Sequence, residues 1–207
     1  MAEVRSRAGH SMVAAGHMGA MILLARHAET ENTALILGHT DVPLTRRGRR
    51  QAEALADIAG DRAVACVYAS PLGRAVETAR IVAERLGVQP IVDARLAETA
   101  KGRWEGRPRA QVKAREPELY DVLRYAPQRF RFPGGESLAE HQRRVVAALR
   151  DIAGGPRPAL VICHDGTIRC ALALSHPQGL AAWRGFSVPP ATPIPFDEGW
   201  LAGSGPA

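Results

Sequence analysis

The fold of this chain is decided by the stretch Leu24-Ala25-Arg26-His27-Ala28-Glu29-Thr30. It closes an apolar run that begins at Met21, and four apolar residues without polar alternation are typical of a strand buried on both faces of a parallel sheet. An Arg, a His and a Glu follow the run at once. Open α/β sheets bind their ligands at the carboxyl ends of their strands, so we expect a binding site here.

Two more apolar runs end in residues that suit the same site. Residues 159–163 are apolar and are followed by His164, and the run 64–69 is followed by a segment that contains Arg74. Parallel strands end at one edge of a sheet, so we expect His164 and Arg74 to lie near the Arg and His of the first stretch. Two imidazoles and two guanidiniums around one point predict a pocket for a dianion.

Helix signals lie between these apolar runs. Ser or Thr at an N-cap, Pro in a first turn and Gly at a helix end are the usual ones. They predict a helix over 46–58, with Thr45 as its cap and Gly60 as its end, and a helix over 71–86, with Ser70 as its cap, Pro71 as its first residue and Gly87 after its end. A third helix is expected to begin at a capping box of Ser137 and Glu140 and to run to about Ile152. Strands are expected at 91–92 and within 185–200. This alternation predicts an α/β fold, in which helices cover both faces of a mostly parallel sheet in three α/β/α layers.

Residues 96–136 break that alternation, because four prolines punctuate a helical stretch. We expect a helical lid insertion over the strand ends, and lids of this kind often choose the substrate. The remaining pattern predicts one domain over 21–207. Residues 1–20 hold charged and polar side chains that interrupt any apolar export segment, and we expect a disordered N-terminal extension there.

Composition narrows the classes of partner. A chain of 207 residues that is 46% hydrophobic can bury one sizeable core. The net charge of +6 and the pI of about 9.9 favour anionic partners, but aromatic residues make up only 5% and no run of five or more basic residues occurs, so we expect no nucleic-acid partner. No apolar run approaches the roughly 18 residues of a membrane span, which predicts no membrane partner. Three cysteines without CxxC spacing are typical of a reducing, cytoplasmic compartment.

At the residues that follow the three apolar runs, the sequence resembles the histidine phosphatase superfamily, the phosphoglycerate mutase-like enzymes. The resemblance extends from Met21 to about Leu201. Arg26-His27-Ala28-Glu29-Thr30 is similar to the Arg-His-Gly-Glu-Thr signature with which the family opens. Further matches in the family's order are Ser70-Pro71-Leu72 with Arg74, Leu96 with Glu98, Trp104-Glu105-Gly106, Pro133-Gly134-Gly135-Glu136-Ser137 and His164 with Gly166.

The resemblance implies a role for each site residue. His27 is the nucleophile that forms a phosphohistidine, and Glu98 is the acid that protonates the leaving group and then activates water. The remaining positions, which hold the phosphoryl oxygens, are Arg26, Arg74 and His164, with Asn32 as a further candidate one residue closer to His27 than the family's usual Asn. For this chemistry His27 must have a ring nitrogen without a proton, and Glu98 must have a raised pKa so that it is protonated. We expect His164 to be an imidazolium, a form that a bound dianion favours.

Two positions depart from the family pattern. Ala28 stands where Gly is usual, and Asp165 replaces the Gly that commonly follows the second His. A carboxylate facing a phosphate would weaken binding, so we expect Asp165 to turn away or to pair with a cation such as an Arg. The seven histidines are scattered, and we expect neither a metal nor another cofactor.

Three functions remain open at this point. Mutases of the family carry a long insertion with a Glu-Arg-His-Tyr signature between the acid and the Gly-Gly-Glu region, and this chain lacks both. We therefore expect a metal-independent phosphomonoester hydrolase that acts on a small phosphorylated substrate. A phosphoglycerate mutase-type phosphoryl transferase and a non-catalytic phosphoester-binding protein are the alternatives. The identity of the substrate and the oligomeric state, for which a homodimer is one option, stay open.

Overall fold

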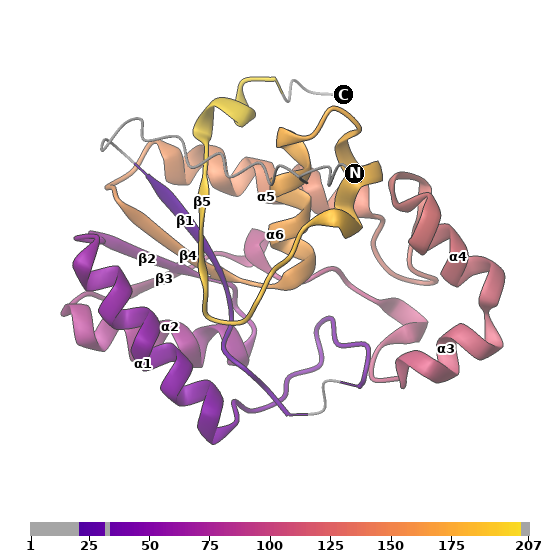
Figure 1. Ribbon diagram of the computed structural model, residues 1–207, viewed down its shortest axis with the longest axis horizontal. Helices are drawn as coiled ribbons and strands as arrows, with labels where there is room; N and C mark the ends of the chain where they lie inside the picture. Colours follow the sequence, from indigo (N-terminus) through magenta and orange to yellow (C-terminus); the bar gives the residue numbers. More distant parts are fainter. Residues whose placement is uncertain (1–20, 32–33, 204–207) are drawn as a thin grey trace, which may run out of the picture.

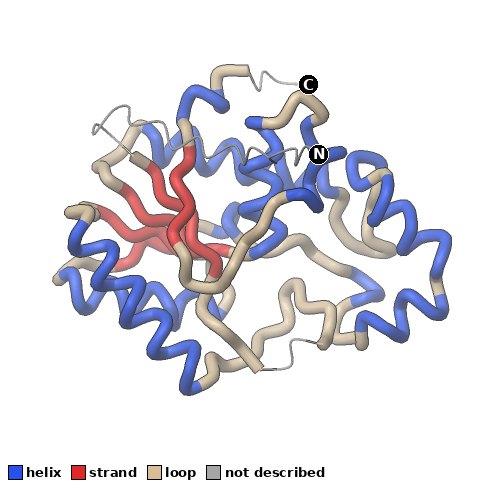
Figure 2. The backbone as a smooth tube through the Cα atoms, viewed as in Figure 1, coloured by secondary structure: helices blue, strands red, loops and turns tan. Residues whose placement is uncertain are grey.

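The computed structural model describes residues 21–31 and 34–203, and its centre is one five-stranded sheet (Figures 1 and 2). The expectations for residues 1–20 and for Asn32 fall outside the described residues. In chain order the strands are β1 (Ile22–Arg26), β2 (Cys66–Ala69), β3 (Pro90–Val92), β4 (Ala159–Cys163) and β5 (Pro193–Phe196). Their order across the sheet is β3-β2-β4-β1-β5.

The sheet is mostly parallel, as the sequence predicts. β4 lies between β1 and β2 and is parallel to both, and β3 is parallel to β2. Only β5 is antiparallel, at the edge beside β1, where Pro193 and Pro195 stand opposite Ala25 and Leu23. Proline has no N–H to give to a ladder, so strands that contain it belong at sheet edges.

Helices cover both faces of the sheet (Figure 1). α1 (Arg46–Asp61) and α2 (Gly73–Leu86) pack on one face, and α5 (Leu138–Ala153) and α6 (Asp165–Leu172) pack on the other. Side chains of β1 alternate between the two cores, because Leu23 lies in the α1–α2 core and Leu24 lies in the α5–α6 core. The three-layer α/β/α arrangement is therefore confirmed.

Cap positions explain where the helices begin and end. The Thr45 hydroxyl accepts a hydrogen bond from the backbone N–H of Gly48, as predicted, and Gly87 adopts a left-handed φ of 68° after α2. The expected start of α2 at Ser70 and Pro71 is wrong, since the helix begins at Gly73. The Ser70 hydroxyl accepts from the N–H of Leu72 at 3.3 Å, ahead of the helix, and also contacts the ring of His164. The expected end of α1 at Ile58 is three residues short, because the helix continues through Gly60 to Asp61.

Two further helices, α3 (Arg109–Arg115) and α4 (Pro117–Tyr125), lie within the predicted lid region and project beyond the sheet (Figure 1). They pack on a separate apolar cluster that contains Trp104, Phe130 and Phe132. The 3-10 helices are η1 (Ala94–Leu96), η2 (Gly102–Trp104), η3 (Pro127–Arg129), η4 (Ala173–Ser175), η5 (Gly179–Gly185) and η6 (Glu198–Leu201). Every helix in the described ranges is too short or too polar to cross a lipid bilayer.

The capping box of α5 gives a stability prediction. The Ser137 hydroxyl accepts from the Glu140 N–H at 3.2 Å, and the Glu140 carboxylate accepts from the Ser137 N–H at 2.9 Å. We expect Ser137→Ala to lower the free energy of unfolding by about 1 kcal/mol, because it leaves an N–H of the first turn unpaired. Urea unfolding measures the change. Ser137→Thr keeps the hydroxyl and is the control; an unchanged midpoint in Ser137→Ala would contradict the prediction.

Candidate active site

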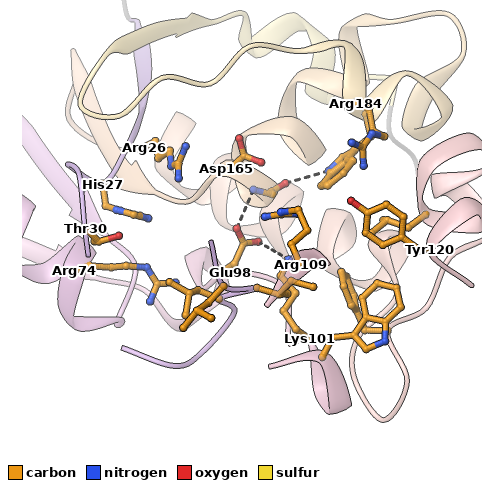
Figure 3. A pocket seen from close by; sticks show the side chains of 18 residues that line it. Arg26, His27, Thr30, Arg74, Glu98, Lys101, Arg109, Tyr120, Asp165 and Arg184 are labelled. Carbon is orange, nitrogen blue, oxygen red and sulfur yellow. Dashed lines mark hydrogen bonds and ion pairs between the residues drawn. The ribbon is translucent and has the colours of Figure 1, made fainter. Parts of the chain in front are cut away.

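Residues far apart in the sequence meet at the carboxyl edge of the sheet (Figure 3). Arg26 ends β1 and His27 follows it, while His164 follows β4. The ring centroids of His27 and His164 are 5.2 Å apart. Arg74 in the first turn of α2 and Glu98 after η1 line the same cavity of about 280 Å³ as Arg26 and His27. The structure thus brings together all the expected site residues that lie within its described ranges.

His27 is held in one tautomer by its own backbone. Its Nδ1 lies 2.8 Å from the carbonyl oxygen of Ala28, which can only accept, so Nδ1 carries the proton and Nε2 keeps a free lone pair. Burial lowers the pKa of His27 to about 3, and the charges of Arg74 and Arg26 act in the same direction. The ring is therefore neutral near pH 7, mainly through burial and only secondarily through charge repulsion.

His164 lies deeper, beneath the cavity, and is 1% exposed. Its Nε2 is 2.7 Å from the Ser70 hydroxyl, and its buried Nδ1 has no partner among the described residues. Burial and the charge of Arg74 hold the pKa of His164 well below its usual value, so the ring of the protein alone is neutral and not the expected imidazolium. When Nε2 accepts from Ser70, Nδ1 carries a proton that it can donate to an anion.

The two arginines differ in how firmly they are held. Buried Arg74 donates to the carbonyl oxygens of Gly38 at 2.6 Å and Thr40 at 2.9 Å, and it contacts the Asp41 carboxylate at 3.3 Å. Arg26 makes one long contact, 3.4 Å from Nη1 to a backbone carbonyl, and its Nε has no partner among the described residues. Arg26 therefore keeps free donors, whereas Arg74 is fixed in place.

Glu98 is buried and fully hydrogen-bonded. Its Oε1 accepts from the N–H of Thr99 at 2.7 Å and from the Thr99 hydroxyl at 3.0 Å, and its Oε2 accepts from the N–H of Gly166 at 3.0 Å. A Cβ at Gly166 would lie 2.2 Å from Oε1, so only glycine permits this approach. Lys101 Nζ lies 3.6 Å from the same carboxylate.

The expectation that Glu98 has a raised pKa is wrong for the protein alone. Burial does raise the pKa of this carboxyl, but Lys101, His141, His164 and the Thr99 N–H together outweigh burial and hold the pKa well below its usual range. The carboxylate form is stabilised by neighbours that come from separate segments of the chain.

The sequence model described as the histidine phosphatase superfamily (branch 1) matches residues 22–194. The chain belongs to this superfamily. Its curated relatives include proteins named probable phosphoglycerate mutase. One from Enterobacter sp. (strain 638) is 36% identical and one from Yersinia enterocolitica is 34% identical, each in an alignment of 157 positions that covers 73% of this chain and 73% of the relative.

Solved structures of phosphatases are also similar to this chain. A mycobacterial glucosyl-3-phosphoglycerate phosphatase in complex with inorganic phosphate has a TM-score of 0.76 and 30% identity, over 89% of this chain and 92% of that one. The alpha-ribazole phosphatase from Shigella flexneri has a TM-score of 0.73 and 27% identity, over 86% of this chain and 90% of that one. The chain is thus an enzyme of a superfamily in which its relatives are named both mutases and phosphatases.

Asp165 pairs with a cation, in agreement with the expectation for this departure from the family pattern. Its carboxylate lies 2.8 Å from Arg169 Nε, one turn further along α6. Arg169 also donates to the carbonyl oxygens of Trp183 and Arg184, which ties the start of α6 to η5. Asp165 still lines the cavity, but its charge is offset by Arg169.

Four residues that the sequence did not indicate belong to this region. Lys101, Arg109 and Arg184 line the cavity, and His141 lies under Glu98 within α5. A histidine on the otherwise apolar, buried face of the helix was the available signal for His141, whereas Arg109 and Arg184 look like ordinary exposed charges. Within residues 21–31 and 34–203, no group of three or more His, Cys, Asp or Glu side chains is arranged to hold a metal ion.

The buried histidines predict a loss of stability in mild acid. The pKa values of His27 and His164 are lowered from 6.5, so below about pH 6.5 the unfolded chain binds protons that the folded chain does not. Their contribution to the free energy of unfolding is therefore complete above pH 6.5. It is lost as the pH falls, by up to about 1.4 kcal/mol per pH unit for each histidine. Urea unfolding at pH 7.5, 6 and 5 measures this slope.

The comparison variant is His27→Gln, which is expected to show a shallower slope because it removes one of the two groups. A free energy of unfolding that stays constant from pH 7.5 to pH 5 would contradict the prediction.

Proposed function

We propose that this protein is a phosphomonoester hydrolase that acts through a phosphohistidine at His27 on a small phosphorylated metabolite. The observation that carries the proposal is that Nε2 of the neutral His27 has no proton and keeps a free lone pair. His27 lines a cavity that Arg26 and Arg74 also line. Phosphoryl transfer requires an in-line nucleophile and fixed positive charge on the equatorial oxygens, and these side chains supply both. The reaction therefore needs no metal ion.

The proposed reaction has two steps. In the first, His27 Nε2 attacks phosphorus, the bond to the leaving oxygen breaks, and that oxygen takes a proton from Glu98. In the second, Glu98 takes a proton from water as the water oxygen attacks phosphorus, which releases inorganic phosphate and frees His27. The phosphoryl oxygens are held throughout by Arg26, Arg74 and Nδ1 of His164.

A phosphoglycerate mutase-type transferase is the main alternative, and the names of the curated relatives favour it. In a mutase the phosphohistidine passes its phosphoryl group to a second hydroxyl and not to water. Hydrolysis is favoured here because residues 99–132 contain only short helices and no long insertion to close the site. A non-catalytic phosphoester-binding protein is less consistent with a complete set of nucleophile, acid and donors.

The charges of the cavity favour a substrate with a second anionic group. Glu98 is offset by Lys101, and Asp165 is offset by Arg169. Arg26 and Arg74 are assigned to the phosphoryl dianion. This leaves two lining cations that have no acidic partner among the described residues, Arg109 of α3 and Arg184 of η5. Figure 3 shows His27 and Arg184 on opposite sides of this pocket, so we propose that Arg109 and Arg184 bind a carboxylate or second phosphate at the far end of the substrate.

The phosphohistidine is tested by labelling. We expect the protein to hydrolyse phosphomonoesters in the presence of EDTA and to incorporate ³²P from a labelled substrate on rapid quenching. His27→Ala should abolish labelling and lower kcat by at least about 10³-fold, because it removes the nucleophile. His176→Ala alters an exposed ring outside the cavity and is the control. Labelling that persists in His27→Ala would contradict the proposal, and isomerisation of 3-phosphoglycerate without phosphate release would favour the mutase.

The second anionic group is tested with a matched pair of substrates. 3-Phosphoglycerate carries a carboxylate where glycerol 3-phosphate carries a hydroxymethyl group, and the two are otherwise identical. We expect Arg109→Gln to raise KM at least about tenfold for 3-phosphoglycerate, which corresponds to about 1.4 kcal/mol, and to leave KM for glycerol 3-phosphate within about twofold. Lys113→Gln, on the same helix but outside the cavity, is the control. Equal effects on both substrates would rule out recognition of a second anion by Arg109.

A further inference from the structure

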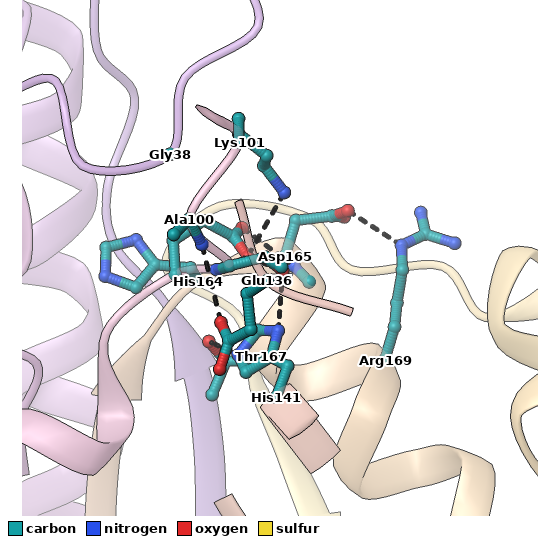
Figure 4. Close-up of polar contacts among 12 residues, drawn as sticks. Gly38, Ala100, Lys101, Glu136, His141, His164, Asp165, Thr167 and Arg169 are labelled. Carbon is teal, nitrogen blue, oxygen red and sulfur yellow. Dashed lines mark hydrogen bonds and ion pairs between the residues drawn. The ribbon is translucent and has the colours of Figure 1, made fainter. Parts of the chain in front are cut away.

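One buried titratable group has no part in the proposed reaction. His141 lies on α5, is 0% exposed, and is hydrogen-bonded at both ring nitrogens (Figure 4). Its Nδ1 is 2.5 Å from the Thr99 hydroxyl and its Nε2 is 3.1 Å from the Thr167 hydroxyl. Because the Thr99 hydroxyl also lies 3.0 Å from Glu98 Oε1, a continuous hydrogen-bond chain joins His141 to the proposed acid.

The protons available to this chain can be counted. Thr167 lies 3.2 Å from the carbonyl oxygen of Ala97, which can only accept, so the single Thr167 proton points there and its oxygen accepts from His141 Nε2. Thr99 likewise has one proton. If Thr99 donates it to the Glu98 carboxylate, Nδ1 of His141 must donate to Thr99. All four hydrogen bonds are then made at once only when both ring nitrogens of His141 carry protons.

A second arrangement satisfies the same contacts. The Nδ1 proton of His141 moves to the Thr99 oxygen as the original Thr99 proton moves to Glu98 Oε1. One N–H and one O–H bond break and two O–H bonds form, so the number of protons is unchanged. Glu98 is now a neutral carboxylic acid that donates to Thr99, and Thr99 donates to Nδ1 of a neutral His141.

We propose that His141 is a positioning residue that stores, through the Thr99 hydroxyl, the proton that Glu98 delivers to the leaving oxygen. The inference rests on the hydrolase function proposed above. It explains how a carboxyl group that its neighbours keep ionised can present a proton to an alkoxide. The proton is retained within the buried unit of Glu98, Thr99 and His141 until the substrate's leaving oxygen takes it.

The charged groups around His141 set the balance between the two arrangements. Burial lowers the pKa of His141, which disfavours the imidazolium and favours the arrangement with a neutral Glu98, while the charge of Glu98 opposes that change. Lys101 stabilises the Glu98 carboxylate and thus the arrangement with the imidazolium. The other charged neighbours, Glu136 and Arg144, form an ion pair at 2.8 Å and add little net charge, and His164 is neutral.

The test compares two leaving groups. p-Nitrophenolate leaves without a proton, whereas the alkoxide of glycerol 3-phosphate requires one. His141→Gln retains hydrogen-bonding groups but cannot store a proton. We expect it to lower kcat/KM for glycerol 3-phosphate at least about tenfold and kcat/KM for p-nitrophenyl phosphate by no more than about twofold. A purely structural role would lower both values by the same factor.

A second pair of variants keeps the test informative if His141→Gln fails to fold. Thr99→Val removes the bridging hydroxyl at nearly constant volume and should give the same selective loss. Thr99→Ser keeps the hydroxyl, so its ratio of kcat/KM for the two substrates should equal that of the unsubstituted protein. Because His141 and Thr99 act in one chain, the double variant His141→Gln, Thr99→Val should be no slower on glycerol 3-phosphate than the slower single variant.

The outcomes separate this inference from the proposed function. Equal losses on the two substrates, or no loss in Thr99→Val, would overturn the role of His141 while the hydrolase stands. An unsubstituted protein that hydrolyses neither substrate would overturn both. A loss confined to glycerol 3-phosphate, with recovery in Thr99→Ser, supports the stored proton.

Discussion

The parallel pairing of β1 with β4 is the constraint on which the rest of the site depends. Arg26 and Cys163 are partners at the ends of these strands, and the N–H of His27 donates to the Cys163 carbonyl at 2.8 Å. Adjacent strands lie about 4.8 Å apart, so the residues that follow them must meet. A slip of one residue would send one of the two rings toward the opposite face of the sheet, and the close approach of His27 and His164 would be lost.

Burial gives the site its protonation states. The same exclusion of water that keeps His27 neutral also disfavours the charged forms of Glu98 and His164. Fixed cations compensate: Lys101 holds the Glu98 carboxylate, and Arg74 is secured by backbone carbonyls from the loop after β1. The pocket is thus organised before a ligand arrives, which lowers the reorganisation that the proposed phosphoryl transfer would require.

Local signals in the sequence were sufficient for the sheet, the three layers and the capping box at Ser137, because each depends on residues close together in the chain. They failed where a distant residue intervenes. Ser70 contacts His164 and does not cap α2, and Lys101 and His141 reverse the expected direction of the Glu98 pKa. Arg109 and Arg184 lie on segments with no motif of their own, so only the folded chain shows that they line the same cavity as His27.

The two prolines of β5 also bear on how copies of this chain can associate. Pro193 and Pro195 cannot donate to β1, so they occupy the positions of β5 whose backbone nitrogens point away from the sheet. An incoming strand would find no amide hydrogens at these positions. The β5 edge is therefore a poor template for extending the sheet into a second molecule.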